Sequence, residues 1–237
     1  MKDSHPLAPR LTRQALAGAQ RVLLSRGSRF KPEVVRIELA AGPAVLKDCA
    51  HLPFWSRWLG RWLLHREARA MERLAGLEGF PPVLARLDAD AVLIGMLAGR
   101  PLDGEAFARA PQQWAAALRQ RVSLMHGRGV YHLDLRQPQN LLIEEEVGTL
   151  GVVDFGAGHC PGPWTAWLVA PLLSWVDRQA VLKYLARFAP QELSRPEAEA
   201  YLRGQFWRRL WIFSPHRNRG AVAAVRRRLQ DLSAMGR

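Results

Sequence analysis

Apolar positions recur with two different periods along the chain, and the change of period divides it into two parts. The first part begins with a helical pattern at 11–20 and continues with short apolar runs, interrupted by glycine and proline, that predict strands. The predicted strands span Arg21–Ser25, Glu33–Ala40, Pro43–Cys49, Pro82–Leu87 and Ala91–Leu97. The first three follow one another directly and are expected to pair antiparallel. Between the third and the fourth, residues 56–76 have a helical pattern with Ser56 as its candidate N-cap.

Beyond Gly99 the helical period dominates. It predicts a helix near 111–127, a short pair of strands at 140–144 and 149–153, and helices over 164–235. The sequence contains no internal repeat and no low-complexity linker. We therefore predict an α+β protein with a strand-rich lobe at 1–98 and a helix-rich lobe at 99–237.

The composition is that of a compact and strongly basic protein. The 237 residues are 49% hydrophobic, which is enough to form a core and excludes a disordered chain. Lys and Arg number 34 against 21 Asp and Glu, and the net charge of +13 favours polyanionic partners: a nucleotide, a phospholipid surface, lipopolysaccharide or nucleic acid. Only four of the basic residues are lysines: Lys2, Lys31, Lys47 and Lys183.

The sequence favours a cytoplasmic protein. Asp3 and His5 lie at the N-terminus without a continuous apolar stretch behind them, so no secretory signal is predicted. The longest apolar run, Trp164–Val176, is too short to cross a bilayer. Cys49 and Cys160 have the spacing neither of a disulfide framework nor of a zinc site. We expect a protein of a reducing compartment, either free in the cytoplasm or peripheral at the inner membrane face.

Two acids, an amide and an arginine surround the predicted strand pair at 140–153. Asp134, Arg136 and Asn140 precede the strands, and Asp154 follows them. Phosphoryl transfer needs a positioned hydroxyl, oxygen ligands for magnesium, and neutralisation of the charge on the transferred group. Asp134 is suited to orient the hydroxyl, and Asn140 and Asp154 are suited to bind metal. Arg136, two residues beyond Asp134, is within reach of a γ-phosphate.

Two motifs in this stretch resemble those of the protein-kinase-like superfamily. The catalytic loop of that superfamily reads H-R-D-L-x-x-x-N, and its metal-binding triplet reads D-F-G. Here they stand as His132-Leu133-Asp134-Leu135, followed by Asn140, and as Asp154-Phe155-Gly156. The resemblance implies a two-lobed fold, with a small antiparallel-sheet N-lobe that carries one main helix, and a helical C-lobe. It also implies ATP and Mg²⁺ as cofactors.

The resemblance implies further residues in the first lobe. A lysine is expected in a preceding strand, and Val45-Leu46-Lys47 supplies it. A glutamate on the following helix is expected to pair with Lys47 and to hold it against the nucleotide phosphates. Glu67 is preferred to Glu72, because the two differ by five residues, about 140° around a helix, and cannot both face the lysine.

The nucleotide-binding segments of the family are present only in reduced form. The glycine-rich loop is reduced to Gly27 within Ser25–Phe30, so the phosphates must be gripped by neighbouring side chains or backbone amides. The segment that contains Met96 and Leu97 resembles the hinge that binds adenine through backbone groups.

Three departures from the family pattern change the expectations. Leu133 stands in place of the usual arginine, so control by activation-loop phosphorylation is not expected, and no A-P-E triplet follows to build a peptide groove. The chain is more similar to the lipopolysaccharide core kinases and RIO-type kinases of bacteria, the first of which phosphorylate sugars of a membrane glycolipid. Asn140 follows Asp134 by six residues, one more than usual, so either the loop bulges at Pro138 or Gln139 takes the metal position. Asn140 is preferred because a strand begins directly behind it.

Two segments interleave tryptophan with arginine. They are Phe54–Trp62 and Arg203–Arg237, and the second carries nine arginines and one acid. One interpretation is docking on an anionic bilayer. The other is that the tryptophans pack inside the protein, since Trp207 and Trp211 have the spacing of a core stripe, and that the arginines form a solvated face. No motif supports nucleic-acid binding.

The sequence thus favours an atypical kinase that uses ATP and magnesium. Its acceptor is the hydroxyl of a membrane glycolipid sugar or of a protein serine or threonine. One alternative is a pseudokinase that binds an anionic partner, which the eroded glycine-rich loop suggests. A small-molecule phosphotransferase is a second alternative, but acidic residues that would hold a cationic substrate are sparse in the second part of the chain.

Overall fold

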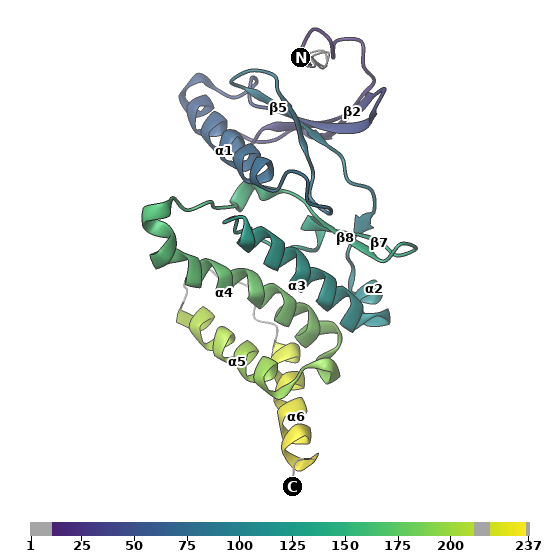
Figure 1. Cartoon of the computed structure of the whole chain (residues 1–237), viewed down its shortest axis with the longest axis vertical. Coiled ribbons are helices and arrows are strands. Elements are labelled where there is room, and N and C mark those ends of the chain that lie inside the picture. The colour runs from purple at the N-terminus through teal and green to yellow at the C-terminus, as the bar shows by residue number, and fades with distance from the viewer. Residues whose placement is uncertain (1–10, 211–218, 236–237) are drawn as a thin grey trace, which may run out of the picture. The chain divides into compact units, whose positions relative to one another are not determined.

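The computed structural model describes residues 11–210 and 219–235 (Figure 1). These residues form an α+β structure that divides into two compact units. Of the described residues, the sheet unit comprises those up to Leu97 together with Asp154–Gly158, and the helix unit comprises Ala98–Val153 and those from His159 onward. The division lies one residue before the predicted boundary. That Asp154–Gly158 belongs to the sheet unit was not predicted from the sequence.

The sheet unit is built on five antiparallel strands in the order β1-β2-β3-β5-β4. The strands are β1 (Arg21–Ser25), β2 (Glu33–Leu39), β3 (Gly42–Asp48), β4 (Val83–Arg86) and β5 (Ala91–Gly95). Each lies within two residues of a predicted strand, and the antiparallel pairing of the first three is confirmed. Alternate residues of β2, β3 and β5 point into one core, which includes Ile37, Ala44, Leu46 and Leu93.

The helix predicted at 11–20 is wrong. The segment forms turns, in which the Leu16 amide donates to the carbonyl of Thr12 at 3.2 Å and the Ala19 amide donates to that of Leu16 at 3.3 Å. Only Leu16 is buried against the sheet, and Gly18 follows it closely. One apolar anchor in so short a segment does not offset the cost of helix nucleation, and the chain must extend again at Arg21.

Helix α1 (Phe54–Arg73) is the main helix of the sheet unit. It begins two residues earlier than predicted and has Pro53, not Ser56, as its N-cap. The Pro53 carbonyl accepts hydrogen bonds from the amides of Ser56 and Arg57 at 3.0 and 2.9 Å, and Ser56 Oγ also donates to it at 3.2 Å. Ser56 is therefore a buried residue of the first turn.

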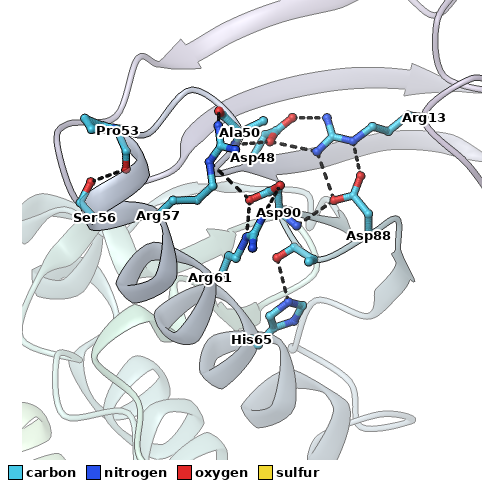
Figure 2. Close-up of polar contacts among 11 residues, drawn as sticks. Arg13, Asp48, Ala50, Pro53, Ser56, Arg57, Arg61, His65, Asp88 and Asp90 are labelled. Atoms are coloured by element: carbon cyan, nitrogen blue, oxygen red, sulfur yellow. Dashed lines mark hydrogen bonds and ion pairs between the residues drawn. The ribbon is translucent and has the colours of Figure 1, made fainter.

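Polar contacts fix one side of α1 to the end of the sheet (Figure 2). Arg61 donates two hydrogen bonds to Asp90, at 2.7 and 2.9 Å, and these hold the pKa of Asp90 below its usual value. Arg13, from the turn before β1, pairs with Asp48 and Asp88. The cluster joins three segments that are distant in sequence: the turn before β1, the end of β3 with α1, and the turn before β5. The opposite side of α1 makes none of these contacts.

In the described residues, the helix unit contains four long helices, a short helix and a short three-stranded sheet. The order of elements is β6 (Arg100–Pro101), α2 (Gly104–Arg109), α3 (Pro111–Gly127), β7 (Leu141–Glu144), β8 (Thr149–Val152), α4 (Pro163–Phe188), α5 (Arg195–Leu210) and α6 (Arg219–Met235). The predicted helix at 111–127 and the predicted strand pair are confirmed. Sequence periodicity missed α2 and β6 because six residues and two residues are too few to show a period.

Helix α4 lies between α3 and α5 (Figure 1) and changes character along its length. Its buried side chains all lie at or beyond Asp177, among them Tyr184, whose ring stacks on Phe107 at 5.6 Å. Its first half contains Pro171 and no buried side chain. Within the ranges that the structure describes, no helix is long and apolar enough to cross a membrane.

Candidate functional site

Lys47 is at the centre of a charged cluster in the sheet unit. It lies on β3, where it pairs in register with Val34 of β2 and Val92 of β5. Its Nζ is 2.5 Å from Glu67 Oε1 and 3.2 Å from Asp154 Oδ1. The side chain of Glu67 is 6% exposed and that of Asp154 is 59% exposed. The lysine is therefore held by one buried carboxylate and one that faces solvent.

The charges of the two carboxylates control the ionisation of Lys47. Burial by itself lowers the pKa of Lys47, but Glu67 and Asp154 outweigh it, and the pKa is raised above its usual value. The lysine is therefore an ammonium ion at neutral pH. A buried carboxylate without this partner would be strongly destabilising, so Glu67 and Lys47 depend on each other.

The structure brings Glu67, and not Glu72, to the lysine. Glu72 lies on the exposed surface of α1, where Arg86 donates to its two oxygens at 2.7 and 2.9 Å. These hydrogen bonds lower the pKa of Glu72. The angular separation of the two glutamates on the helix accounts for their different partners.

Asp154 has an unusual backbone conformation that its neighbours hold in place. Its φ is +62°, in the left-handed region that few residues other than glycine adopt. The next residue, Phe155, is fully buried, with its ring 6.3 Å from that of Phe80. The carbonyl of Gly156 accepts a hydrogen bond from Arg66 Nη2 of α1 at 2.6 Å. These anchors attach the segment to the sheet unit.

Asp134 and Asn140 lie together in the helix unit. Asn140 is buried, and its Nδ2 donates to the carbonyl oxygen of Asp134 at 3.0 Å and to Asp134 Oδ2 at 3.3 Å. A turn of 3₁₀ helix at Pro138–Asn140 accommodates the extra residue, and Gln139 is exposed. Because the amide nitrogen is directed at Asp134, the amide oxygen is the atom of Asn140 suited to a metal.

Asp177 holds the backbone of this loop and was missed in the sequence. Its carboxylate is 1% exposed and accepts hydrogen bonds from the amides of His132 and Leu133, at 2.9 and 2.7 Å, and from His126 Nε2 at 3.0 Å. The φ of Leu133 is +66°, a strained conformation for a leucine. The two amide contacts explain how this conformation persists. A signal was present, because Asp177 is the first charged residue after an uncharged run from Phe155 to Val176.

His132 has a structural role. Its ring is fully buried, with Nε2 donating to the carbonyl of Val153 at 3.0 Å and Nδ1 accepting from the amide of Asp134 at 3.3 Å. Two further residues of α4 contact the same loop. Tyr184 Oη donates to the Leu135 carbonyl at 3.4 Å, and Lys183 Nζ donates to the carbonyl of Arg136, whose side chain is half-buried.

Gly27 is required by the turn in which it lies. Its φ is +69°, and a Cβ there would collide with the carbonyl oxygens of Lys31 and Pro32. Met96 is 41% exposed, and its amide donates to the Pro43 carbonyl at 3.2 Å, while Leu97 is half-buried. The Met96 amide is thus engaged with the chain at the start of β3.

The structure separates the two interpretations of the tryptophans only in part. Trp55, Trp58 and Trp62 are exposed, so the expectation that they pack in a core is wrong for them. The side chains of Trp207 and Trp211 lie outside the described residues.

Comparisons with known proteins add no assignment. No protein-family model matches the chain, and no curated protein sequence is significantly similar to it. Among the residues that the structure describes, no group of three or more His, Cys, Asp or Glu side chains is placed to hold a metal ion. The functional argument therefore depends on the two clusters around Lys47 and Asp134.

Proposed function

We propose that the chain is an atypical kinase of protein-kinase-like fold, which transfers the γ-phosphate of ATP to a hydroxyl. The observation that carries the proposal is the contact of Lys47 with both Glu67 and Asp154. Each residue alone has an ordinary structural explanation. A charged lysine between a buried and an exposed carboxylate, together with an Asp–Asn pair in the second unit, is more specific.

Lys47 and Glu67 are suited to hold the nucleotide phosphates. An ammonium is a compact charge that fits between phosphate oxygens, whereas a guanidinium would present a wide fork. Glu67 keeps this charge in place from a buried position and, with 6% exposure, is itself inaccessible to a ligand. Arg26 and Arg29, both exposed beside Gly27, add positive charge for the same phosphates.

The chemistry of two side chains, one in each unit, suits a magnesium ion. Asp154 offers an exposed carboxylate, and Asn140 offers an amide oxygen, which are the hard oxygen ligands that Mg²⁺ accepts. When bound, the ion would neutralise charge on the transferred phosphoryl group.

Asp134 would orient the acceptor and receive its proton. In the proposed step the hydroxyl oxygen forms a bond to the γ-phosphorus, and the bond from that phosphorus to the bridging oxygen of ADP breaks. The hydroxyl proton passes to the Asp134 carboxylate. Asn140 and the amide-bound loop keep the carboxylate in position, and Arg136 would contact the γ-phosphate. Adenine would meet backbone groups near Met96 and Leu97 other than the Met96 amide, which is already engaged.

The proposed acceptor is a sugar hydroxyl of a membrane glycolipid or a serine or threonine of a protein. The resemblance to lipopolysaccharide kinases favours the glycolipid. Leu133 removes the arginine through which activation-loop phosphorylation usually acts, so we propose that the enzyme is not controlled in that way.

A pseudokinase that acts as a scaffold is the second candidate. The turn around Gly27 favours it, because Ser28 and Lys31 exchange backbone hydrogen bonds at 3.2 and 3.3 Å and the glycine is explained without a nucleotide. Such a protein would keep the Lys47–Glu67 pair for its stability alone.

Thermal unfolding with ATP and magnesium distinguishes the two candidates. A ligand at about 100 times its dissociation constant stabilises by about 2.7 kcal/mol, and we expect such a shift for the wild type. Asp154→Asn should abolish it. Asp231→Asn, the same change at an exposed site of α6, should retain it. An unchanged unfolding temperature of the wild type at millimolar ATP would contradict the kinase proposal and favour the scaffold.

A further inference from the structure

Most tryptophans of this protein are on its surface. Of those whose side chains the structure describes, Trp114 alone is buried, at 3% exposure. The others are exposed: Trp55 48%, Trp58 67%, Trp62 55%, Trp164 89%, Trp167 76% and Trp175 36%. Tryptophan is normally buried to a large extent, so these exposed rings require an explanation beyond folding.

Three of the exposed tryptophans begin a continuous stripe on α1. Residues 55, 58, 62, 66, 69 and 73 are separated by three or four positions, and at 100° per residue they fall within about 80° of the helix circumference. The stripe reads Trp55, Trp58, Trp62, Arg66, Arg69, Arg73. We call it the aromatic–basic face. It contains no acidic residue, and it lies away from the buried side of the helix, which carries Gly60, Leu64 and Met71.

The contacts of α1 with the end of the sheet leave this face outward, and within it Arg66 also donates to a backbone carbonyl, that of Gly156 at 2.6 Å. Arg57, Arg61 and His65 join the helix to the end of the sheet (Figure 2). On the helix they lie about 140°, 100° and 60° from the centre of the stripe. On the face itself, the guanidinium of Arg66 lies 5.0 Å from the centroid of the Trp62 ring. Arg69 and Arg73 are exposed.

Positive charge continues beside the aromatic end of the face. Phe30 packs edge-on against Trp55, with ring centroids 5.6 Å apart, and is itself 45% exposed. Its loop carries exposed Arg26, Arg29 and Lys31 and has no acidic residue. Basic residues therefore lie at both ends of the row of exposed aromatic rings.

We propose that the aromatic–basic face of α1 docks on an anionic phospholipid bilayer. Tryptophan is favoured at the boundary between lipid headgroups and acyl chains, and arginine can extend its charge to the headgroups while its stem covers apolar surface. An amphipathic helix of this kind lies in the plane of the interface. The absence of acid from the face and the net charge of +13 complement an anionic surface, which is why we commit to a bilayer.

The first half of α4 provides a second surface suited to the same partner. Residues 163–176 contain no charged side chain. Trp164, Trp167, Leu168, Leu172 and Trp175 recur at helical spacing and are exposed. Exposed Arg178 follows Trp175 by three positions, on the same side of the helix by spacing. The helix is not long and apolar enough to span a bilayer, so this stripe would lie on the membrane surface.

Flotation of the full-length protein with vesicles tests the proposal. Vesicles of phosphatidylcholine and phosphatidylglycerol in equal parts should carry the protein and shift its tryptophan emission to the blue. Vesicles of phosphatidylcholine alone should bind it far more weakly. Binding that is equal for the two compositions, or absent for both, would overturn the proposal.

Paired variants locate the binding surface. Each arginine near an anionic surface contributes about a fivefold gain in affinity, so Arg69→Ala with Arg73→Ala should weaken binding about 30-fold. Trp58→Ser with Trp62→Ser should remove much of the emission shift. The matched control, Arg226→Ala with Arg227→Ala, removes the same charge from exposed positions of α6 and should bind as the wild type does.

The remaining outcomes contradict the proposal. An equal loss in the α6 control would show that net charge, and not this face, governs binding. A Trp58→Ser, Trp62→Ser variant that binds vesicles normally but changes the oligomeric state in light scattering would identify the face as an interface between copies of the chain. Far-UV circular dichroism confirms that each variant is folded, and the nucleotide-induced thermal shift is measured separately, so failure of docking is distinguishable from failure of the proposed function.

Discussion

Asp177→Asn is the most informative single change in the helix unit. The carboxylate of Asp177 accepts three hydrogen bonds, from the amides of His132 and Leu133 and from His126 Nε2, at 1% exposure. Asparagine preserves the shape of the side chain but replaces one acceptor oxygen by a donor. At least one buried N–H is then left without an acceptor.

The cost of the change follows from these contacts. An orphaned buried donor costs about 1–3 kcal/mol, and each bond that changes from a charged to a neutral acceptor loses about 1 kcal/mol more. Removing a buried charge recovers part of this loss, because the neutral amide is less costly to desolvate. We expect a net destabilisation of about 2–3 kcal/mol. For a chain of this size the unfolding temperature should fall by roughly 4–12 °C.

The variant should also lose function below its unfolding temperature. Leu133 has φ +66° and immediately precedes Asp134, so a relaxed backbone at Leu133 displaces the proposed acceptor-binding carboxylate. The assay is differential scanning fluorimetry, followed by phosphotransfer at a temperature where the variant is still folded. Asp231→Asn on exposed α6 is the matched control and should be unchanged in both measurements.

Two results would refute this reasoning. If Asp177→Asn unfolded within about 1 °C of the control, the carboxylate would not be holding the two amides in solution. If the variant were destabilised but retained full phosphotransfer, the conformation of Leu133 would not be needed to position Asp134.

Three further changes test other parts of the structure. Glu67→Gln should lower the unfolding temperature and weaken the ATP-dependent shift, whereas Glu72→Gln on the surface of α1 should lower the unfolding temperature less and leave the shift unchanged. Burial raises the pKa of the fully buried Cys49 thiol to about 11, so a thiol reagent at about pH 8 should modify at most one cysteine, Cys160, in the native protein and both after unfolding. The pKa of Asp90 is lowered in the folded protein by its arginine partner, so its contribution to stability is complete above the unfolded pKa of about 4 and is lost as the pH falls through the folded pKa. Asp90→Asn should therefore lower the unfolding temperature at neutral pH and have a progressively smaller effect as the pH falls below about 4.

Sequence patterns predicted most of the strands and helices, because these elements depend mainly on the apolar spacing and turn residues of their own segments. The strands of the sheet unit are short apolar runs interrupted by glycine and proline, of which β2 and β3 alternate in burial along their centres. Helix α3 was predicted at its observed bounds. The segment at 11–20 was misassigned because its helical pattern depends on a single buried leucine, Leu16, whose packing on the sheet is a long-range effect. The N-cap of α1 was misassigned because serine usually caps, whereas Pro53 begins this helix.

The candidate site was predictable where a motif or helical spacing specifies it. Spacing on α1 separated Glu67 from Glu72, and the strand behind Asn140 favoured it over Gln139. Asp177 was not predictable in this way, because it is 37 residues beyond Asn140 and reaches the loop only through tertiary packing. The positive φ of Leu133 was not predictable either, because leucine has no preference for the left-handed backbone conformation.

Helix α4 combines two properties that folding alone does not explain. From Asp177 onward it carries all of its buried side chains, and three of its side chains in this half bind the backbone of the loop that carries Asp134. Before Asp177 it has no buried side chain, exposes three tryptophans, and contains Pro171, which weakens the hydrogen bonding of the helix. Packing stabilises that first half less than the second, and its exposed apolar rings favour aggregation. An external apolar partner would cover these rings and stabilise the first half of the helix. Because α4 is continuous, a partner bound there would contact the same helix that holds the Asp134 loop.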